Sequence, residues 1–203
     1  MIHITKVRSE QQIADVVALA QEIWKEHYLP IVGQEQIDYM LEKFQSEGAI
    51  STQLSDGYEY YSVTYNGHNA GYMAVISNVS ESSLMISKIY VRKSNRGCGL
   101  GKQMLEFAEA LCQQRKIMKI WLTVNKYNNH SIEWYSQVGF TNTGPIIQDI
   151  GGGFVMDDFR MEKSIQHIMG FRQFMLRGFE KAKGEWNLMC IAYNLKRLHI
   201  MRG

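Results

Sequence analysis

Seven consecutive residues, Arg96 to Lys102, combine three glycines with two cationic side chains. The stretch follows a strand-like run, 84–91, and leads into a helix-like run, 103–111. Glycines let a backbone approach a ligand closely, and the N–H groups at a helix start converge where the helix dipole favours negative charge. The pattern therefore predicts a phosphate-binding turn, although many glycine-rich turns bind nothing.

A second group of polar and aromatic residues follows about thirty positions later, from Asn128 to Phe140. Asn128 is a residue type that caps helices, and Gly139 before Phe140 is typical of a helix end followed by a buried strand residue. Tyr135 lies inside the short helix between them. Its ring either packs in the core, the commoner fate of such a residue, or presents a phenol to a ligand.

Composition and charge bound the kind of protein that carries these motifs. The 203 residues are 45% hydrophobic and 21% charged, an ordinary balance for a soluble globular chain. The sequence contains no apolar run long enough to span a bilayer and no signal-peptide pattern, and its three cysteines lack metal-ligand spacing. We therefore expect a reduced, cytoplasmic protein without a metal, a disulfide or a membrane partner.

Charge also divides the chain. Residues 1–163 hold 15 Lys and Arg against 18 Asp and Glu, a formal charge of −3, whereas residues 164–203 hold 7 against 2, a charge of +5. A shift of that size marks a boundary. We expect a first domain over 1–163 and a distinct tail over 164–203.

Hydrophobic periodicity gives the elements that must position the motifs. A capping box at Ser9 opens a helix that Pro30 should close by about Leu29. A second helix and a short connector up to Gly57 follow. The remaining order is three strands, of which the first two form a hairpin at Asn66-Gly67, then a helix, a strand, a short helix and two strands. The strand–helix–strand unit over 86–124 predicts parallel or neighbouring strands.

The two motifs together resemble a known family. An Arg-x-x-Gly-x-Gly turn after a strand, then Asn-x-x-Ser-Ile-x-x-Tyr-x-x-x-Gly-Phe, is similar to the GNAT superfamily of acetyl-CoA-dependent N-acetyltransferases. The resemblance covers about residues 1–163. It implies an α/β (α+β) fold with a mixed central sheet flanked by helices, and acetyl-CoA as cosubstrate.

The resemblance also implies roles for particular residues. The pyrophosphate of the cofactor is expected on the turn, its pantetheine arm along the preceding strand and beside the later helix, and the leaving thiolate is expected to take a proton from Tyr135. The cofactor-binding residues implied in this way are Ile89, Tyr90, Val91, Arg96, Gly97, Cys98, Gly99, Leu100, Gly101, Lys102, Asn128 and Ser131.

The acceptor side is less defined. Direct attack by an amine requires loss of a proton, and no residue stands out as the base. The resemblance puts the acceptor near the first helices and strands, where Glu22, Glu26, His27, Tyr28 and Tyr60 lie. We favour Glu26 or His27, although two glutamates four residues apart more often belong to a solvated helix face. The run 88–163 most resembles bacterial polyamine acetyltransferases, which favours a polyamine or similar small amine; peptide N-termini and lysine side chains stay open.

Residues 168–203 resemble the C-terminus of DDE insertion-sequence transposases. Two apolar helical faces are expected there, and they favour a homodimer contact over nucleic-acid binding. A fused gene end explains the tail without any transposase activity. The chain is thus interpreted as an N-acetyltransferase for a primary amine. The alternative is a non-catalytic or DNA-associated fusion whose tail selects its partner.

Overall fold

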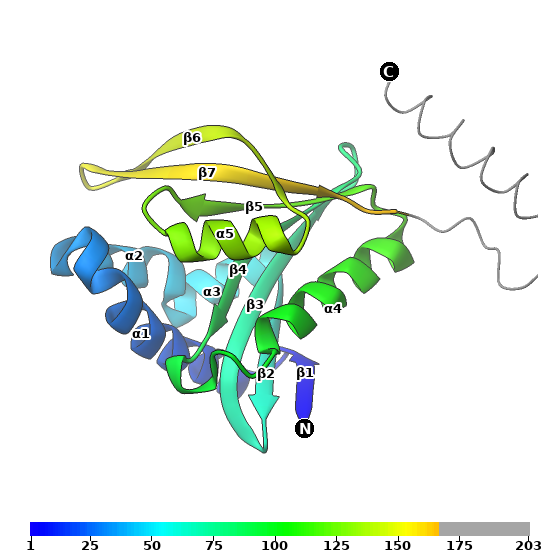
Figure 1. The fold of residues 1–203 in the computed structure, drawn as a ribbon. Helices are drawn as coiled ribbons and strands as arrows, with labels where there is room; N and C mark the ends of the chain where they lie inside the picture. Colours follow the sequence, from blue (N-terminus) through cyan, green and yellow to red (C-terminus); the bar gives the residue numbers. More distant parts are fainter. Residues whose placement is uncertain (167–203) are drawn as a thin grey trace, which may run out of the picture. The chain divides into compact units, whose positions relative to one another are not determined.

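The computed structural model describes residues 1–166 of the chain. The two helices and the dimer contact expected after residue 168 lie outside the described residues. The described part is an α/β unit built on one seven-stranded sheet, which confirms the expected fold class (Figure 1). Its strands are β1 (Ile2–Lys6), β2 (Glu59–Tyr65), β3 (His68–Asn78), β4 (Ser83–Val91), β5 (Lys119–Asn125), β6 (Thr141–Gly151) and β7 (Phe154–Ser164).

The sheet has the order β1-β2-β3-β4-β5-β7-β6, and every neighbouring pair except β4–β5 is antiparallel. The expected hairpin between β2 and β3 turns at Asn66 and Gly67, whose φ angles of 50° and 83° suit a tight turn with two left-handed residues. The expected strand–helix–strand unit is confirmed, because β4 and β5 are parallel and a helix connects them.

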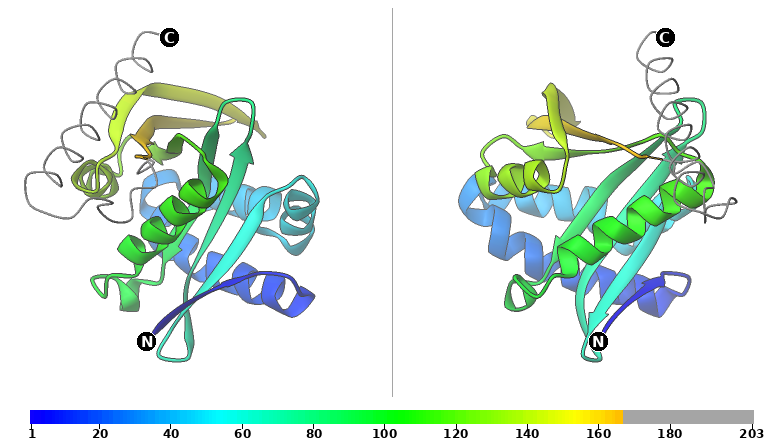
Figure 2. Two further views of the ribbon diagram at one scale, coloured as in Figure 1. Left: turned by 90° about the vertical axis from the view of Figure 1, so that its right-hand side faces the viewer. Right: turned by 45° about the vertical axis from the view of Figure 1, so that its right-hand side comes forward.

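Helices cover both faces of the sheet, which therefore has a core on each side (Figures 1 and 2). The helices are α1 (Glu10–Val32), α2 (Gln34–Gln45), α3 (Glu47–Ser55), α4 (Leu100–Arg115) and α5 (Asn129–Gln137). One core joins α4 and α5 to inward residues such as Leu84, Ile120 and Leu122. The other joins α1, α2 and α3 to Tyr60 and Tyr72. Apolar residues at helical spacing explain both contacts, since buried side chains of α4 recur at Leu100, Met104, Ala108 and Cys112.

Two local expectations were wrong, and one strand was not predicted. Residues 2–6 form that strand, which pairs with β2, and residues 47–55 form α3 rather than a connector. Pro30 lies inside α1, which continues to Val32. Proline removes one helical hydrogen bond, and within the last turn that loss is small because Gly33 N–H still reaches the carbonyl of Leu29 at 3.2 Å. The capping box at Ser9 and Gln12 is confirmed.

Candidate active site

The parallel strands β4 and β5 separate half-way along their length. They pair only through Ser83–Ile86 and Lys119–Leu122, whereas β4 continues to Val91 and β5 to Asn125. The β5-facing backbone edge of 87–91 therefore has no strand partner within the described residues. Such an edge offers main-chain donors and acceptors to an extended ligand.

A β-bulge lies where the strands separate. Ala74 pairs with Lys88 but Val75 pairs with Ile86, so Ser87 is an extra residue on β4. The extra residue shifts the alternation of side chains. Ile86 and Ile89 both belong to the core under α4 and α5, while Tyr90 packs in the core under α1. The bulge thus aims Tyr90 at α1 and leaves Ile89 on the opposite face.

The glycine turn lies just beyond the end of β4. Gly97 and Gly99 have φ angles of 80° and 81°, which side-chain-bearing residues rarely adopt, and Gly99 caps α4. No described residue accepts a hydrogen bond from the N–H groups at the start of α4, which belong to Gly99, Leu100, Gly101 and Lys102. These groups and the exposed Arg96 and Lys102 side chains make an anion-binding helix start.

Gly101 serves a packing role as well. A Cβ atom built on it would lie 3.3 Å from two ring carbons of Trp134 on α5. The glycine therefore allows α4 to approach α5, the helix that carries Tyr135. Cys98, in the middle of the turn, is exposed and forms no disulfide with the other described cysteine, Cys112.

Tyr135 is buried, with 8% of its surface exposed, and its ring contacts those of Trp134 and Phe140. Its hydroxyl forms no hydrogen bond with any residue between 1 and 166. Burial raises the pKa of this phenol, and the proximity of Tyr28 adds to the shift. The phenol therefore stays protonated at neutral pH and is free to donate a proton or hydrogen bond.

Tyr28, at the C-terminal end of α1, is the centre of an aromatic cluster at the split. Its ring lies 5.1 Å from that of Trp24 and 6.4 Å from that of Tyr90, and a side-chain hydrogen bond joins Tyr28 to Tyr90. Burial raises the pKa of Tyr90, and the nearby Tyr28, Tyr72 and Tyr135 hydroxyls act in the same direction. Tyr135 from the α5 face and Tyr28 from the α1 face are thus electrostatic neighbours, which the separation of β4 and β5 permits.

His27 and Asn128 connect the two sides of the site. The Asn128 amide nitrogen lies 3.1 Å from His27 Nε2, while its carbonyl oxygen accepts the N–H of Ser131 at 3.3 Å and caps α5. Burial lowers the pKa of His27, and the charge of Arg96 acts in the same direction. The imidazole is therefore neutral at neutral pH, with Nε2 as the acceptor of the amide.

The remaining acceptor-side residues lie apart. Glu22 pairs with Arg92 at 2.8 Å and Glu26 with Lys93 at 3.1 Å, both at the surface. Tyr60 is fully buried, and its hydroxyl lies 2.8 Å from Gln53 Oε1 and 2.5 Å from Lys88 Nζ. The structure therefore groups His27, Tyr28, Asn128 and Tyr135 at the split, with Tyr60 in a separate buried polar cluster.

Sequence reasoning missed one charged residue of the site. Asp158 on β7 is only 5% exposed and lies opposite Asn125 at the end of β5. Its carboxylate is hydrogen-bonded to the Thr123 side chain and acts electrostatically on Tyr28. Burial raises the pKa of Asp158. The only sequence signal was an Asp at a strand position whose neighbours alternate into the core, which is too common a pattern to single it out.

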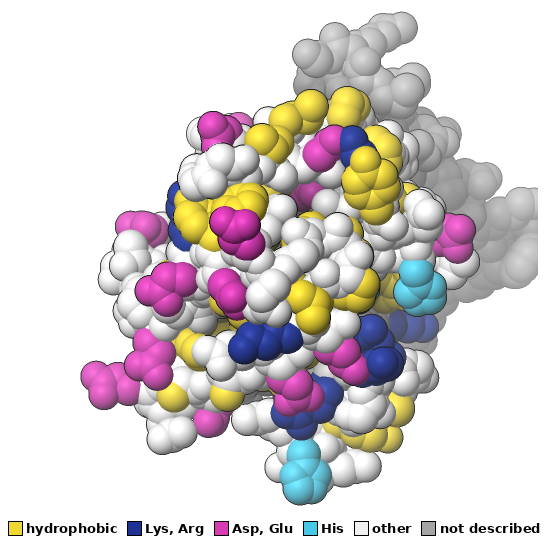
Figure 3. All heavy atoms as spheres, turned by 90° about the vertical axis from the view of Figure 1, so that its left-hand side faces the viewer, with side chains coloured by type: hydrophobic (Ala, Val, Ile, Leu, Met, Phe, Trp, Pro, Cys, Tyr) yellow, Lys and Arg dark blue, Asp and Glu magenta, His cyan; other side chains and the backbone are white. Residues whose placement is uncertain are grey.

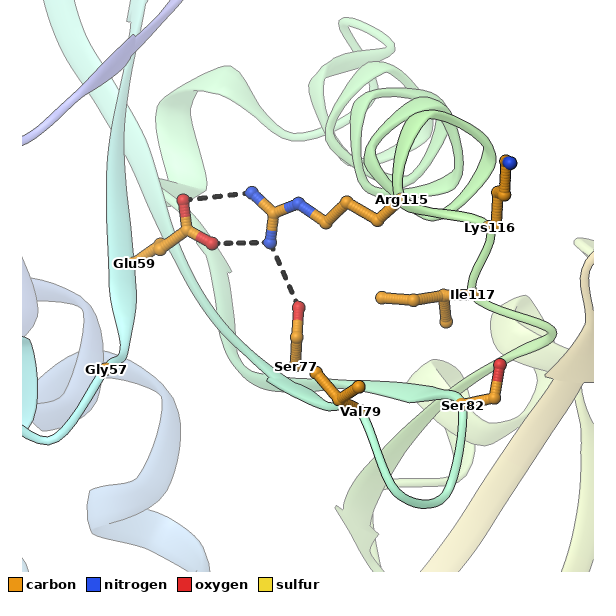
Figure 4. Close-up of a pocket in the computed structure, with 8 residues that line it drawn as sticks. All are labelled: Gly57, Glu59, Ser77, Val79, Ser82, Arg115, Lys116 and Ile117. Atoms are coloured by element: carbon orange, nitrogen blue, oxygen red, sulfur yellow. Dashed lines mark hydrogen bonds and ion pairs between the residues drawn. The ribbon is translucent and has the colours of Figure 1, made fainter.

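A hollow of about 430 Å³ lies elsewhere, at the C-terminal end of α4 (Figure 4). Its lining includes Glu59 and Arg115, which form a two-pronged ion pair with N–O distances of 2.5 and 3.0 Å. The glycine turn is at the opposite end of the same helix, so this hollow is not part of the split. Among the described residues, no group of three or more His, Cys, Asp or Glu could hold a metal ion, and no helix is long and apolar enough to cross a membrane.

Solved structures share this fold. The PaiA N-acetyltransferase of Thermoplasma acidophilum, solved with coenzyme A, superposes with a TM-score of 0.65 at 21% identity over 81% of this chain and 99% of its own. The ribosomal-protein-S18-alanine N-acetyltransferase of Escherichia coli gives 0.62 at 18% identity over 86% and 100%. The described part of the chain therefore shares the fold of these two N-acetyltransferase structures.

Sequence comparison gives the family. The Acetyltransferase (GNAT) family matches residues 16–140, more than half of the chain, and the chain therefore belongs to this family of acetyltransferases. A relative described as an uncharacterized N-acetyltransferase in the pepI 3'region of Lactobacillus delbrueckii subsp. lactis is 27% identical over 77% of this chain and 94% of its own length. The streptothricin acetyltransferase of Streptomyces lavendulae is 29% identical over 44% and 48%. Residues 160–199 match a transposase DDE domain.

Proposed function

We propose that the protein transfers the acetyl group of acetyl-CoA directly to a primary amine, with Tyr135 as the general acid. The observation that carries the proposal is the split between β4 and β5, which opens between a helix start with free N–H groups and an unbonded phenol. A cofactor whose pyrophosphate binds the turn 96–102 would run its pantetheine arm along 89–91. Its thioester would then reach the level of Tyr135.

The reaction requires few protein groups. The neutral amine attacks the thioester carbonyl, an N–C bond forms, the C–S bond breaks, and the departing sulfur takes the phenolic proton of Tyr135. The excess proton on nitrogen restores the phenol or leaves to solvent. A thiol ordinarily has a pKa near ~8.5 and a phenol near ~10. Burial in the split raises both pKa values, so the difference between them need not change much for the phenolic proton to pass to sulfur. Within the proposal, a main-chain N–H of the open β4 edge stabilises the carbonyl oxygen as it becomes negative.

His27 and Asn128 are proposed to act from the acceptor side. Neutral His27 is proposed to accept a proton from the acceptor once its Nε2 exchanges the Asn128 amide for the amine, and the Asn128 amide holds the ring in orientation until then. Within the proposal, Ser131 contributes through the backbone N–H that Asn128 accepts. The acceptor is a small amine, with polyamines favoured; a soluble cytoplasmic enzyme is consistent with these substrates.

The test is thiol release from acetyl-CoA with a panel of primary amines that includes spermidine, a lysine amide and a simple alkylamine. Tyr135→Phe should lower kcat by about 10²-fold while the affinity for coenzyme A, measured by calorimetry, stays within about twofold. Tyr127→Phe is the matched control, because Tyr127 lies just before α5 with 68% of its surface exposed. Full turnover in Tyr135→Phe would refute the role of the phenol. Absence of coenzyme A binding and of thiol release in the wild type would refute the proposal as a whole.

The tail calls for a separate proposal. The match of residues 160–199 to a transposase DDE domain, far shorter than a nuclease core, supports a fused gene end. We propose that residues 1–163 are the acetyltransferase domain and 164–203 the remnant. Genomic sequence just downstream should contain transposon remnants, and removal of the residues after Gln166 should leave kcat unchanged. A salt-sensitive retention of DNA that is lost on this truncation would instead favour the alternative of a DNA-associated fusion.

A further inference from the structure

Asp158 is a buried carboxylate without a cationic partner among residues 1–166. None of the ion pairs in this part of the chain includes it. The neighbouring cations have other partners, since Lys126 pairs with Asp157 and Arg160 lies 2.7 Å from Glu162. Aspartate is almost never this buried unless it is paired, because an isolated charge loses its hydration. The one stabilising contact is the hydrogen bond with Thr123.

The surroundings of this carboxylate suit an organic cation. The negative charge of Asp158 lies near enough to Tyr28 to raise the pKa of its phenol, and the Tyr28 ring belongs to the cluster with Trp24 and Tyr90. Aromatic faces attract ammonium groups, and a carboxylate at their edge supplies the opposite charge. Arg96 also acts on Tyr28, but no ion pair joins it to Asp158. A cation that enters beside Tyr28 would therefore supply the positive charge that the Asp158 carboxylate lacks among the described residues.

Position in the sheet connects Asp158 to the split. Its partner in register is Asn125, the last residue of β5, and β5 is the strand that separates from β4. Thr123 and Asn125 lie on the face of β5 opposite to Leu122 and Val124, which pack under α4 and α5. Asp158 thus approaches the split from the α1 face, whereas Tyr135 approaches it from the α5 face. An amine bound at Asp158 and a thioester beside Tyr135 would meet within the split.

We infer that Asp158 binds the ammonium group of the acceptor and so selects cationic primary amines; the bound ammonium passes one proton to His27 or to solvent, and the neutral nitrogen then attacks the thioester. The inference rests on the proposed function and names its acceptor site. The side of the molecule that carries α1, α2 and the β6–β7 turn displays many acidic side chains, with Lys and Arg gathered on its lower half (Figure 3). The acidic side chains attract a cation towards this side of the molecule, and the Lys and Arg side chains oppose that attraction on the lower half.

The experiment compares Asp158→Asn with Asp157→Asn in the full chain. Asn keeps the shape and the hydrogen bond to Thr123 but removes the charge, and Asp157 is the adjacent carboxylate that already pairs with Lys126. With the best amine of the panel, Asp158→Asn should raise KM by about 30-fold or more, as for loss of one partner of a buried charge pair. Asp157→Asn should leave KM within about twofold, and both variants should keep the wild-type affinity for coenzyme A.

Stability separates this role from a structural one. Removal of an uncompensated buried charge should leave the melting temperature of Asp158→Asn equal to that of the wild type or higher. A lower melting temperature with an unchanged KM would mean that Asp158 only supports the fold, and an unchanged KM at any stability overturns the inference. If the wild type acetylates amines and Asp158→Asn has the same KM as the wild type, the proposed acceptor site is wrong but the proposed function stands. If the wild type neither binds coenzyme A nor releases thiol, both fail.

Discussion

Lys88 is buried in the core under α1 and α3, with 6% of its surface exposed. Its ammonium group lies 2.5 Å from Gln53 Oε1 and 2.5 Å from the Tyr60 hydroxyl, and no carboxylate pairs with it in the described chain. Loss of hydration on burial lowers the pKa of Lys88 from 10.5 to about 7. Replacement of this residue by methionine, which has nearly the same length and no charge, isolates that effect.

The sign follows from proton binding. Because the folded pKa is depressed, the unfolded chain binds one more proton than the folded chain between pH 7 and 10.5, so the stability of the wild type rises with pH over this range. A shift from 10.5 to about 7 corresponds to about 4–5 kcal/mol at most. The hydrogen bonds to Gln53 and Tyr60 favour the charged form and offset part of it, and we expect a rise of about 2–4 kcal/mol, with a slope below ~1.4 kcal/mol per pH unit.

The measurement is urea unfolding of the wild type and Lys88→Met at pH 7, 8, 9 and 10. The difference between the two proteins cancels the other titrating groups and should shift in favour of the wild type as the pH rises. Lys25→Met, at an exposed position of α1, controls for loss of a surface charge. A wild-type-minus-variant difference that stays constant over these four pH values would refute the account, since Lys88 would then titrate alike in the folded and unfolded chains.

Two further substitutions test the packing of β4 and the ion pair at the far end of α4. Gly71→Ala should lower the free energy of unfolding in urea by about 1–3 kcal/mol and weaken coenzyme A binding, because the added Cβ would lie 2.5 Å from the carbonyl oxygen of Tyr90. The control is Gly48→Ala, which should cost nothing because no atom lies within 4 Å of its added Cβ. Equal losses of stability in the two variants would contradict this reason. Burial raises the pKa of Glu59, but hydrogen bonds from Arg115 and other donors outweigh it and lower the value to about 2. The stability that these contacts contribute is present above pH 4.5 and lost as the pH falls towards 2. Glu59→Gln should therefore lower the free energy of unfolding by about 1 kcal/mol at pH 6, after allowance for solvent screening. Acid-unfolding curves that run parallel for the variant and the wild type would exclude this contribution of Glu59.

The sequence was sufficient where local signals and tertiary packing agree. Ser9 with Gln12, Asn66 with Gly67, and the glycines at 97 and 99 each require one backbone conformation, and the structure has that conformation at all three places. Long apolar periodicities gave α1, α2 and α4 for the same reason. These elements needed no knowledge of distant partners.

The missed elements depend on partners far along the chain. Residues 2–6 are too short to indicate a strand alone, and they become one by pairing with 61–65. The sequence of α3 contains Gly48 and three Ser or Thr residues, which are poor helix formers, and the helix is held by the Ser46 cap and the full burial of Ile50. The bulge at Ser87 is a pairing irregularity that only the register reveals.

The candidate site was predictable in part. The turn 96–102 and Tyr135 could be predicted because each belongs to a motif in which several residue types recur at fixed spacing. Asp158 did not, because its importance arises from burial and from the lack of a cation beside it, and neither property can be read from residue type. Tyr28 was predicted only as one of several acceptor-side residues, and its central position needed the structure because its neighbours come from α1, β4, α5 and β7.

Only four register pairs join β1–β4 to β5, β7 and β6 within the described sheet. A ligand whose amide groups bond to the open edge of β4 would add rungs to this short seam and act as a strand of the sheet. Binding of the ligand would then strengthen the connection between strands β1–β4 and strands β5, β7 and β6. At a ligand concentration 100 times its Kd, the folded state would gain about 2.7 kcal/mol. Saturation with cofactor should accordingly slow amide hydrogen exchange in 83–91 and 119–125 more than in the hairpin of β2 and β3.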